Sequence, residues 1–225
     1  MTAKLATADD LRPIVLTLYG LTFVTGLIDA VSYLGLGRVF TANMTGNVVF
    51  VGFALGGAAD ISIVRPVIAL AAFGAGSVLG GRMVNFRDRS AAVQLLRAMS
   101  MEITFIVAAA LATFTIESTG LSLVIVLTAM AMGLRNAVVR KLAVPDFTTT
   151  VLTMALTAVA ADSRLAGGKV VRQGRRLLMI VVMCAGALIG TAVLRSFGTF
   201  AAFISAVVVV ALLASYLRMR AARTD

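Results

Sequence analysis

The chain has 225 residues, of which 60% are hydrophobic and 13% are charged, and its mean hydropathy is +1.01. This composition excludes an ordinary soluble domain and indicates an integral membrane protein. The net charge of +10 argues little for nucleic acid, because the basic residues flank apolar segments and are not interleaved with aromatic side chains. We expect no nucleic-acid partner, and we interpret the basic residues as topology signals that also contact anionic lipid head groups.

Cysteine and histidine limit the possible chemistry. Cys184 is the single cysteine and there is no histidine, which excludes an intrachain disulfide, a cysteine-built metal site and His-ligated metals. No nucleophile has a base beside it in the sequence, so we expect neither an enzyme nor a cofactor. The N-terminal residues carry no signal-peptide pattern, and we expect the first apolar segment to be retained.

Eight apolar stretches follow one another: 14–36, 40–55, 67–84, 99–116, 121–139, 147–161, 177–194 and 199–217. The second contains several polar residues, and the sixth would extend only about 22 Å, against a hydrocarbon core of about 30 Å. We predict half-helices or re-entrant segments for these two. The remaining six stretches predict six crossings.

The distribution of lysine and arginine favours six crossings over eight. With six crossings and both termini inside, 16 basic residues lie inside and three outside, with Arg135 in the membrane; eight crossings would give 11 and eight. Basic residues concentrate on the cytoplasmic side of membrane proteins. The sequence therefore predicts cytoplasmic termini.

An internal repeat accompanies this pattern. Residues 26–41 align with 133–148, and two glycine pairs further along also align. The matches are Gly26 with Gly133, Leu27 with Leu134, Ala30 with Ala137, Val31 with Val138, Phe40 with Phe147, Thr41 with Thr148, Gly76 with Gly186 and Gly80 with Gly190, while Asp29 falls on Asn136. Composition alone can produce such matches, but a true repeat is the better interpretation.

Three crossings per half place the two halves in opposite orientations, as in many transporters and channels. The predicted fold is therefore an all-α integral membrane protein with about six transmembrane helices in two inverted three-helix repeats, each with a broken or re-entrant helix. We assign 1–13 to a cytoplasmic tail, 14–117 and 118–217 to the two repeats, and 218–225 to a basic cytoplasmic tail.

Asp29 is the first candidate for function, because it lies well inside an apolar stretch. A buried carboxylate needs a charged partner or water. Arg135 and Asn136 occupy the equivalent turn of the second repeat, so we predict that Asp29 contacts one of them within the membrane. The alternatives are an ion pair that only locks the halves together and a carboxylate coupled to a solute or proton. Glu102 and Glu117 lie near segment ends and are predicted to be interfacial.

Polar side chains begin both predicted half-helices: Asn43, Thr45 and Asn47 in the first, and Thr148, Thr149 and Thr150 in the second. Unpaired N–H groups at helix starts suit anions or polar substrate atoms. The alternative is that these side chains only cap the helices. Gly76, Gly80, Gly186 and Gly190 are predicted to allow close helix packing, between the halves or in a homodimer.

The run GLIDAVSYLGLGRVFTANMTGNVVF, residues 26–50, resembles the YoaK-like family of uncharacterised bacterial membrane proteins, and so do GLRNAV at 133–138 and TTTVLT at 148–153. The resemblance implies a multi-pass inner-membrane protein with about six crossings, and it implies no substrate.

The sequence thus favours a transporter or channel for a small polar or ionic solute in a bacterial plasma membrane. Asp29, Asn43, Thr45, Asn47, Arg135, Asn136 and 148–150 would line its substrate site. The competing class is a non-transporting scaffold or lipid-interacting protein in which the same polar residues form a dry, paired core. The sign of the solute's charge stays open, because Asp29 favours a cation or proton and the helix starts favour an anion.

Overall fold

A computed structural model of the chain describes residues 8–58, 60–84, 90–114, 118–142, 152–163, 167 and 173–222. The regular structure within these ranges is entirely helical, as predicted. The helices are α1 (Ala8–Gly35), α2 (Met44–Leu55), α3 (Val64–Val84), α4 (Ala91–Ala112), α5 (Ser118–Leu142), α6 (Leu152–Ala161) and α7 (Gln173–Ala221).

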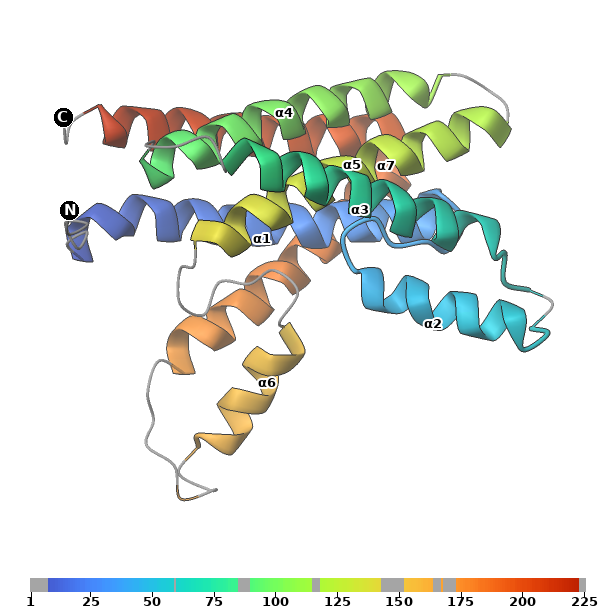
Figure 1. The fold of residues 1–225 in the computed structure, drawn as a ribbon, viewed down its shortest axis with the longest axis horizontal. Coiled ribbons are helices and arrows are strands. Elements are labelled where there is room, and N and C mark those ends of the chain that lie inside the picture. The colour runs from blue at the N-terminus through green and yellow to red at the C-terminus, as the bar shows by residue number, and fades with distance from the viewer. Residues whose placement is uncertain are drawn as a thin grey trace.

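Within the described ranges, five helices are long and apolar enough to cross a membrane: α1 from Arg12 onward, α3, α4, α5 from Gly120 onward and α7. The last has 49 residues, so as a straight helix it would extend about 73 Å, more than twice the thickness of a hydrocarbon core. Gly198 interrupts it with φ 82° and ψ 178°. This break lies between the apolar stretches 177–194 and 199–217, and the orange and red parts of α7 run in different directions in Figure 1.

The long helices pack in pairs. α1 contacts α7 along much of its length, α3 contacts α5, and α4 contacts both α5 and α7. The start of α1 and the end of α7 lie at the same end of the bundle (Figure 1). The core comes from the apolar faces of these helices, including Leu21, Ile125 and Phe203.

Glycines bring α3 and α5 into close contact. A Cβ atom at Gly76 would meet the backbone carbonyl of Met130, and one at Gly80 would meet that of Leu134. On the facing helix, a Cβ at Gly133 would meet the carbonyl of Phe73. The two backbones are therefore too close for any side chain at these positions, which is how small residues allow dispersion contacts between helices in lipid.

α1 and α7 make the same kind of contact. A Cβ at Gly186 would meet the carbonyl of Phe23, and one at Gly190 would meet that of Leu27. From the other side, a Cβ at Gly26 would meet the carbonyl of Met183. Both helix pairs therefore depend on two glycines in one helix and one glycine in its partner.

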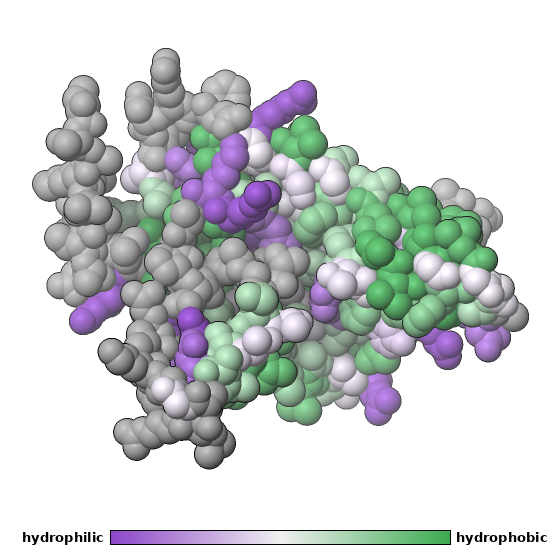
Figure 2. All heavy atoms as spheres, turned by 60° about the horizontal axis from the view of Figure 1, so that its bottom comes forward, coloured by the Kyte–Doolittle hydropathy of each residue, from purple (hydrophilic) through white to green (hydrophobic). Residues whose placement is uncertain are grey.

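The two short helices cannot span a bilayer. α2 has 12 residues and α6 has 10, which gives lengths of about 18 Å and 15 Å. α2 begins midway along the bundle and runs towards the end opposite the termini (Figure 1). Apolar side chains gather on its side of the molecule in Figure 2, and Val48, Phe53 and Leu55 of α2 are exposed.

Candidate functional site

Three charged side chains are buried among the described residues: Asp29, Glu102 and Arg135. They come from α1, α4 and α5, three of the helices that could cross a membrane. Charged side chains inside such helices are costly unless they are paired or reach water. The candidate site is therefore built on these three residues, which we call the buried charged cluster.

Arg135 makes the direct contacts within the buried charged cluster. One terminal guanidinium nitrogen donates to Glu102 Oε1 at 2.8 Å, and the other donates to Thr25 Oγ1 at 2.6 Å and contacts Met132 Sδ at 3.1 Å. Arg135 and Glu102 are both fully buried. A buried ion pair of this kind joins α5 to α4, while Thr25 links the same guanidinium to α1.

Asp29 lies one helical turn beyond Thr25 on α1, so the two side chains share a face. Its Oδ1 accepts a hydrogen bond from the backbone N–H of Ala42 at 3.0 Å. The carboxylate also interacts electrostatically with Arg135. Asp29 is therefore held mainly by the loop that precedes α2, and Arg135 acts on it without an ion pair.

The predicted partner of Asp29 is thus corrected. Arg135 forms its ion pair with Glu102 and not with Asp29. Asn136, the other predicted partner, is half-buried on α5. The expectation that Glu102 is interfacial was wrong, since Glu102 is completely buried.

Glu102 had a signal in the sequence. The buried residues of α4 include Leu95, Met99, Glu102, Ile106 and Ala109. Their spacing of three or four residues defines one helical face, and Glu102 lies in the middle of it. Reading the apolar positions as a continuous stripe would have placed this carboxylate inside the protein.

Four buried polar atoms in and beside the buried charged cluster have no hydrogen-bond partner among the described residues. They are Oδ2 of Asp29, Oε2 of Glu102, Nε of Arg135 and Oγ1 of Thr41. Thr41 precedes Ala42, whose amide binds Asp29. Buried polar groups of native proteins are nearly always satisfied. Two carboxylate oxygens, one hydroxyl and one N–H are therefore available to bind a polar ligand or, at the carboxylates, a proton.

The polar residues at the start of α2 have separate roles. Asn47 is fully buried, and its amide nitrogen donates to the Phe40 carbonyl at 2.6 Å while its Oδ1 accepts from the Phe40 N–H at 3.0 Å. This pair of bonds fixes the loop against α2. Asn43 and Thr45 are exposed, and the Asn43 side chain makes no capping hydrogen bond. The remaining predicted site residues, Thr148, Thr149 and Thr150, lie outside the described residues.

A cavity of about 290 Å³ lies beyond Asp29, at the end of the bundle opposite the termini. Tyr33, Phe50, Arg38, Asp60 and Arg65 are among its lining residues. Tyr33 follows Asp29 by one turn of α1. Its ring stacks on Phe40 with centroids 5.0 Å apart, and Phe40 stacks on Phe50 at 6.0 Å. Three aromatic rings therefore pack beside this cavity, near the loop that binds Asp29.

Comparison with known proteins places the chain in a family. The family described as "Protein of unknown function (DUF1275)" matches residues 17–215, which is most of the chain. The chain belongs to this family. The UPF0700 transmembrane protein YoaK of Bacillus subtilis (strain 168) is 29% identical over 193 residues, covering 81% of this chain and 84% of YoaK. No solved structure matches the chain.

The resemblance to the YoaK-like family is therefore confirmed, and the relative's name supports a transmembrane protein. The part of the chain that matches DUF1275 contains Thr25, Asp29, Glu102 and Arg135. Neither the family's description nor the name YoaK states a substrate or an activity, so the function has to be argued from the site.

Proposed function

We propose that this protein transports or conducts a small polar or ionic solute across the membrane, with the buried charged cluster as its solute site. The observation that carries the proposal is the set of unpaired buried polar atoms around Asp29, Glu102 and Arg135. The proposed architecture is two inverted three-helix repeats with six crossings and cytoplasmic termini.

The glycine contacts support the inverted repeats. Gly133 follows Gly26 by 107 positions, and Gly186 follows Gly76 by 110. Adding 107 to a position in α1 gives its counterpart in α5, and adding 110 to a position in α3 gives its counterpart in α7. The close contacts of the two helix pairs then correspond one to one: Gly186 on Phe23 with Gly76 on Met130, Gly190 on Leu27 with Gly80 on Leu134, and Gly26 on Met183 with Gly133 on Phe73. The offsets that align the sequences also align the three-dimensional contacts, which chance matches in an apolar sequence would not do.

The break at Gly198 supports the sixth crossing. It divides α7 into a part before residue 198 and a part after it, each with more than 20 residues. Each part is long enough to cross a hydrocarbon core by itself. With α1, α3, α4 and α5, the two parts make six crossings, and α2 becomes the re-entrant segment of the first repeat.

Charge counting supports a solute that carries positive charge. With all three groups ionised, two carboxylates and one guanidinium leave one excess negative charge inside the protein. Isolated charges are strongly disfavoured in a medium of low dielectric constant. A proton on one carboxylate or a small cation beside Asp29 neutralises the cluster, so either fits the proposal.

The cavity of about 290 Å³ gives this solute a route. In the proposed orientation it opens to the outside. Tyr33 lines it and stacks on Phe40, which belongs to the same loop as the Ala42 amide that binds Asp29. We assign the stacked rings as the barrier between the cavity and the cluster. The exposed Asn43 and Thr45 then belong to the mouth of the pathway, and Asn47 is a structural residue that holds the loop.

A scaffold is the second candidate function, and the ion pair between Arg135 and Glu102 favours it. The two groups are fully buried and lie 2.8 Å apart, as a rigid connection between α4 and α5 requires. Asp29 distinguishes the two functions, because no described residue forms an ion pair with it and a rigid connection between α4 and α5 does not require it.

The test is ion flux through purified protein in liposomes. Proton and Na⁺ movement would be followed with entrapped fluorescent dyes under an imposed gradient, for the natural chain, for Asp29→Asn and for Asp162→Asn. Asp162 pairs with Arg176 and is 47% exposed, so it controls for the loss of a carboxylate elsewhere. The proposal expects a flux that Asp29→Asn abolishes and Asp162→Asn retains. Absence of both proton and Na⁺ flux in the natural chain would contradict a cation or proton pathway and favour the scaffold.

A further inference from the structure

A second cavity, larger than the first, lies at the other end of the bundle. It measures about 630 Å³ and is lined by α4 and α7, with Met83 of α3 at its edge. The lining residues are Met83, Val93, Leu96, Arg97, Ser100, Met101, Ala214, Ser215 and Arg218. We call this cavity the α4–α7 groove.

The groove is on the outer surface of the bundle. Val93 and Met101 on its α4 wall are 37% and 38% exposed. Both helices are long and apolar enough to cross a membrane, so their outward-facing apolar side chains contact lipid. The occupant of the groove therefore comes from the bilayer and carries apolar chains.

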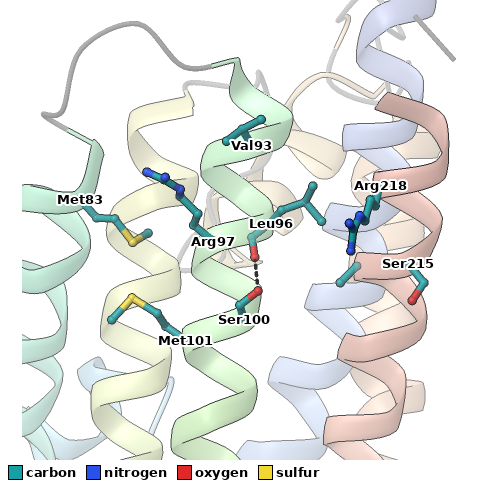
Figure 3. A pocket seen from close by; sticks show the side chains of 9 residues that line it. Met83, Val93, Leu96, Arg97, Ser100, Met101, Ser215 and Arg218 are labelled. Atoms are coloured by element: carbon teal, nitrogen blue, oxygen red, sulfur yellow. Dashed lines mark hydrogen bonds between the residues drawn. The ribbon is translucent and has the colours of Figure 1, made fainter. Parts of the chain in front are cut away.

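The described lining of the groove carries only positive charge. Arg97 and Arg218 line it, and none of the described residues that line it is acidic. No described residue forms an ion pair with either guanidinium. Figure 3 shows Leu96 and Arg218 directed into the space between α4 and α7, while Arg97 points to the other side of α4, towards Met83. The two guanidinium groups thus flank an apolar centre.

The depth of these arginines matches a lipid head group. Arg97 is six residues from the start of α4, and Arg218 is three residues from the end of α7. Both therefore lie within about 10 Å of a helix end, where long basic side chains reach the head-group layer while their stems remain among apolar groups.

We propose that the α4–α7 groove binds an anionic phospholipid, with Arg218 on its phosphodiester, Arg97 as a second positive charge across α4, and the apolar walls against its acyl chains. The charge complementarity favours an anionic lipid, because a zwitterionic lipid would bring a positive charge to a site whose described lining has two arginines and no acidic residue. Under the proposed topology this end of the bundle is cytoplasmic, and basic residues near that surface attract anionic lipid. The groove is separate from the buried charged cluster, so this inference does not rest on the proposed transport.

The experiment is a lipid titration of the detergent-purified protein, followed by native mass spectrometry. The probes are phosphatidylglycerol, phosphatidylcholine with the same acyl chains, and inorganic phosphate as competitor. We expect the natural chain to bind phosphatidylglycerol more tightly than phosphatidylcholine. The double variant Arg97→Gln, Arg218→Gln should lose roughly 30-fold in affinity for phosphatidylglycerol, which is the typical contribution of two basic residues near an anionic surface.

Two matched variants control for charge and folding. Arg220→Gln removes a guanidinium that lies over the Tyr216 ring at 5.6 Å and does not line the groove, and it should retain the preference. Arg97→Lys with Arg218→Lys keeps both charges and should retain most of it. Equal binding of both lipids, or a preference that survives the double glutamine variant, would overturn the assignment. Displacement of the lipid by inorganic phosphate would also overturn it, because the groove would then recognise the anion alone.

Discussion

Replacing Arg135 with methionine is the most informative single change, because this side chain joins three helices. It is fully buried and contacts Glu102 at 2.8 Å and Thr25 at 2.6 Å. Methionine has a similar length and no charge, so it fills the space and leaves Glu102 and Asp29 without a cation. Breaking a buried ion pair by removing one partner typically costs about 3–5 kcal/mol. We expect a loss of stability in that range.

The assay is equilibrium unfolding in mixed micelles, with the natural chain, Arg135→Met, Glu102→Leu and the double variant. Removing both charges eliminates the unpaired carboxylate of Glu102, so the double variant should recover part of the loss, while Asp29 still lacks a cation. Arg140→Met is the control, since Arg140 is exposed on the same helix and should change stability by no more than about 0.5 kcal/mol. A loss of less than 1 kcal/mol for Arg135→Met, or a double variant less stable than either single one, would refute the assignment of a buried ion pair.

Three further changes test the fold and the loop. Asn47→Ala removes both hydrogen bonds to the Phe40 backbone, so it should lower the free energy of unfolding by about 1–3 kcal/mol and speed amide exchange at Phe40. Asn43→Ala is the control and should have little effect. Unchanged exchange at Phe40 in Asn47→Ala would contradict the role of Asn47. Gly186→Ala places a methyl group against the Phe23 carbonyl and should lower the unfolding midpoint. Gly174→Ala on the same helix is the control, because its methyl group would meet nothing within 4 Å. Equal midpoints for the two variants would contradict the close packing of α1 and α7. Gly80→Ala should destabilise the contact of α3 with α5 in the same way relative to Gly81→Ala, which is also open, and indistinguishable melting curves would argue against it.

Much of the fold follows from hydropathy. Long apolar stretches predict the spanning helices, and the short apolar runs in 40–55 and 147–161 correspond to α2 and α6, of ordinary half-helix length. Hydropathy also separates 177–194 from 199–217, and Gly198 breaks α7 between them. These features are local, because the cost of burying polar backbone in lipid acts on each segment separately.

The site was only partly predictable. Asp29 was found because a carboxylate inside an apolar stretch is conspicuous. Glu102 was placed near a segment end because Gln94 and Arg97 interrupt the hydropathy, so the apolar stretch starts at 99. The helix itself begins at Ala91, which puts Glu102 near its middle. A polar residue on the outer face of a helix can thus hide the true start of a buried segment.

The partners within the site depend on tertiary structure. Arg135 has two carboxylates near it, and which of them forms the ion pair follows from how α4 packs on α5. Similarly, the binding of Asn47 to Phe40 depends on the path of the loop between α1 and α2. Neither contact leaves a periodic signal in the sequence.

Thiol accessibility of Thr41 is the most direct test of a solute pathway through the buried charged cluster. After Cys184→Ser, single cysteines would replace Thr41, Thr45 and Ala206. Thr41 is fully buried beside the Ala42 amide, Thr45 is exposed, and Ala206 is fully buried among apolar residues. A membrane-impermeant thiol reagent would then be applied from each side. Transport predicts that the cysteines at 45 and 41 both react with the reagent. The cysteine at 41 should react more slowly, and an excess of the permeant ion should block its reaction. The cysteine at 206 should stay unreactive. If the cysteine at 41 is as unreactive as the one at 206 from both sides, the cluster is dry and the protein is not a transporter through this site.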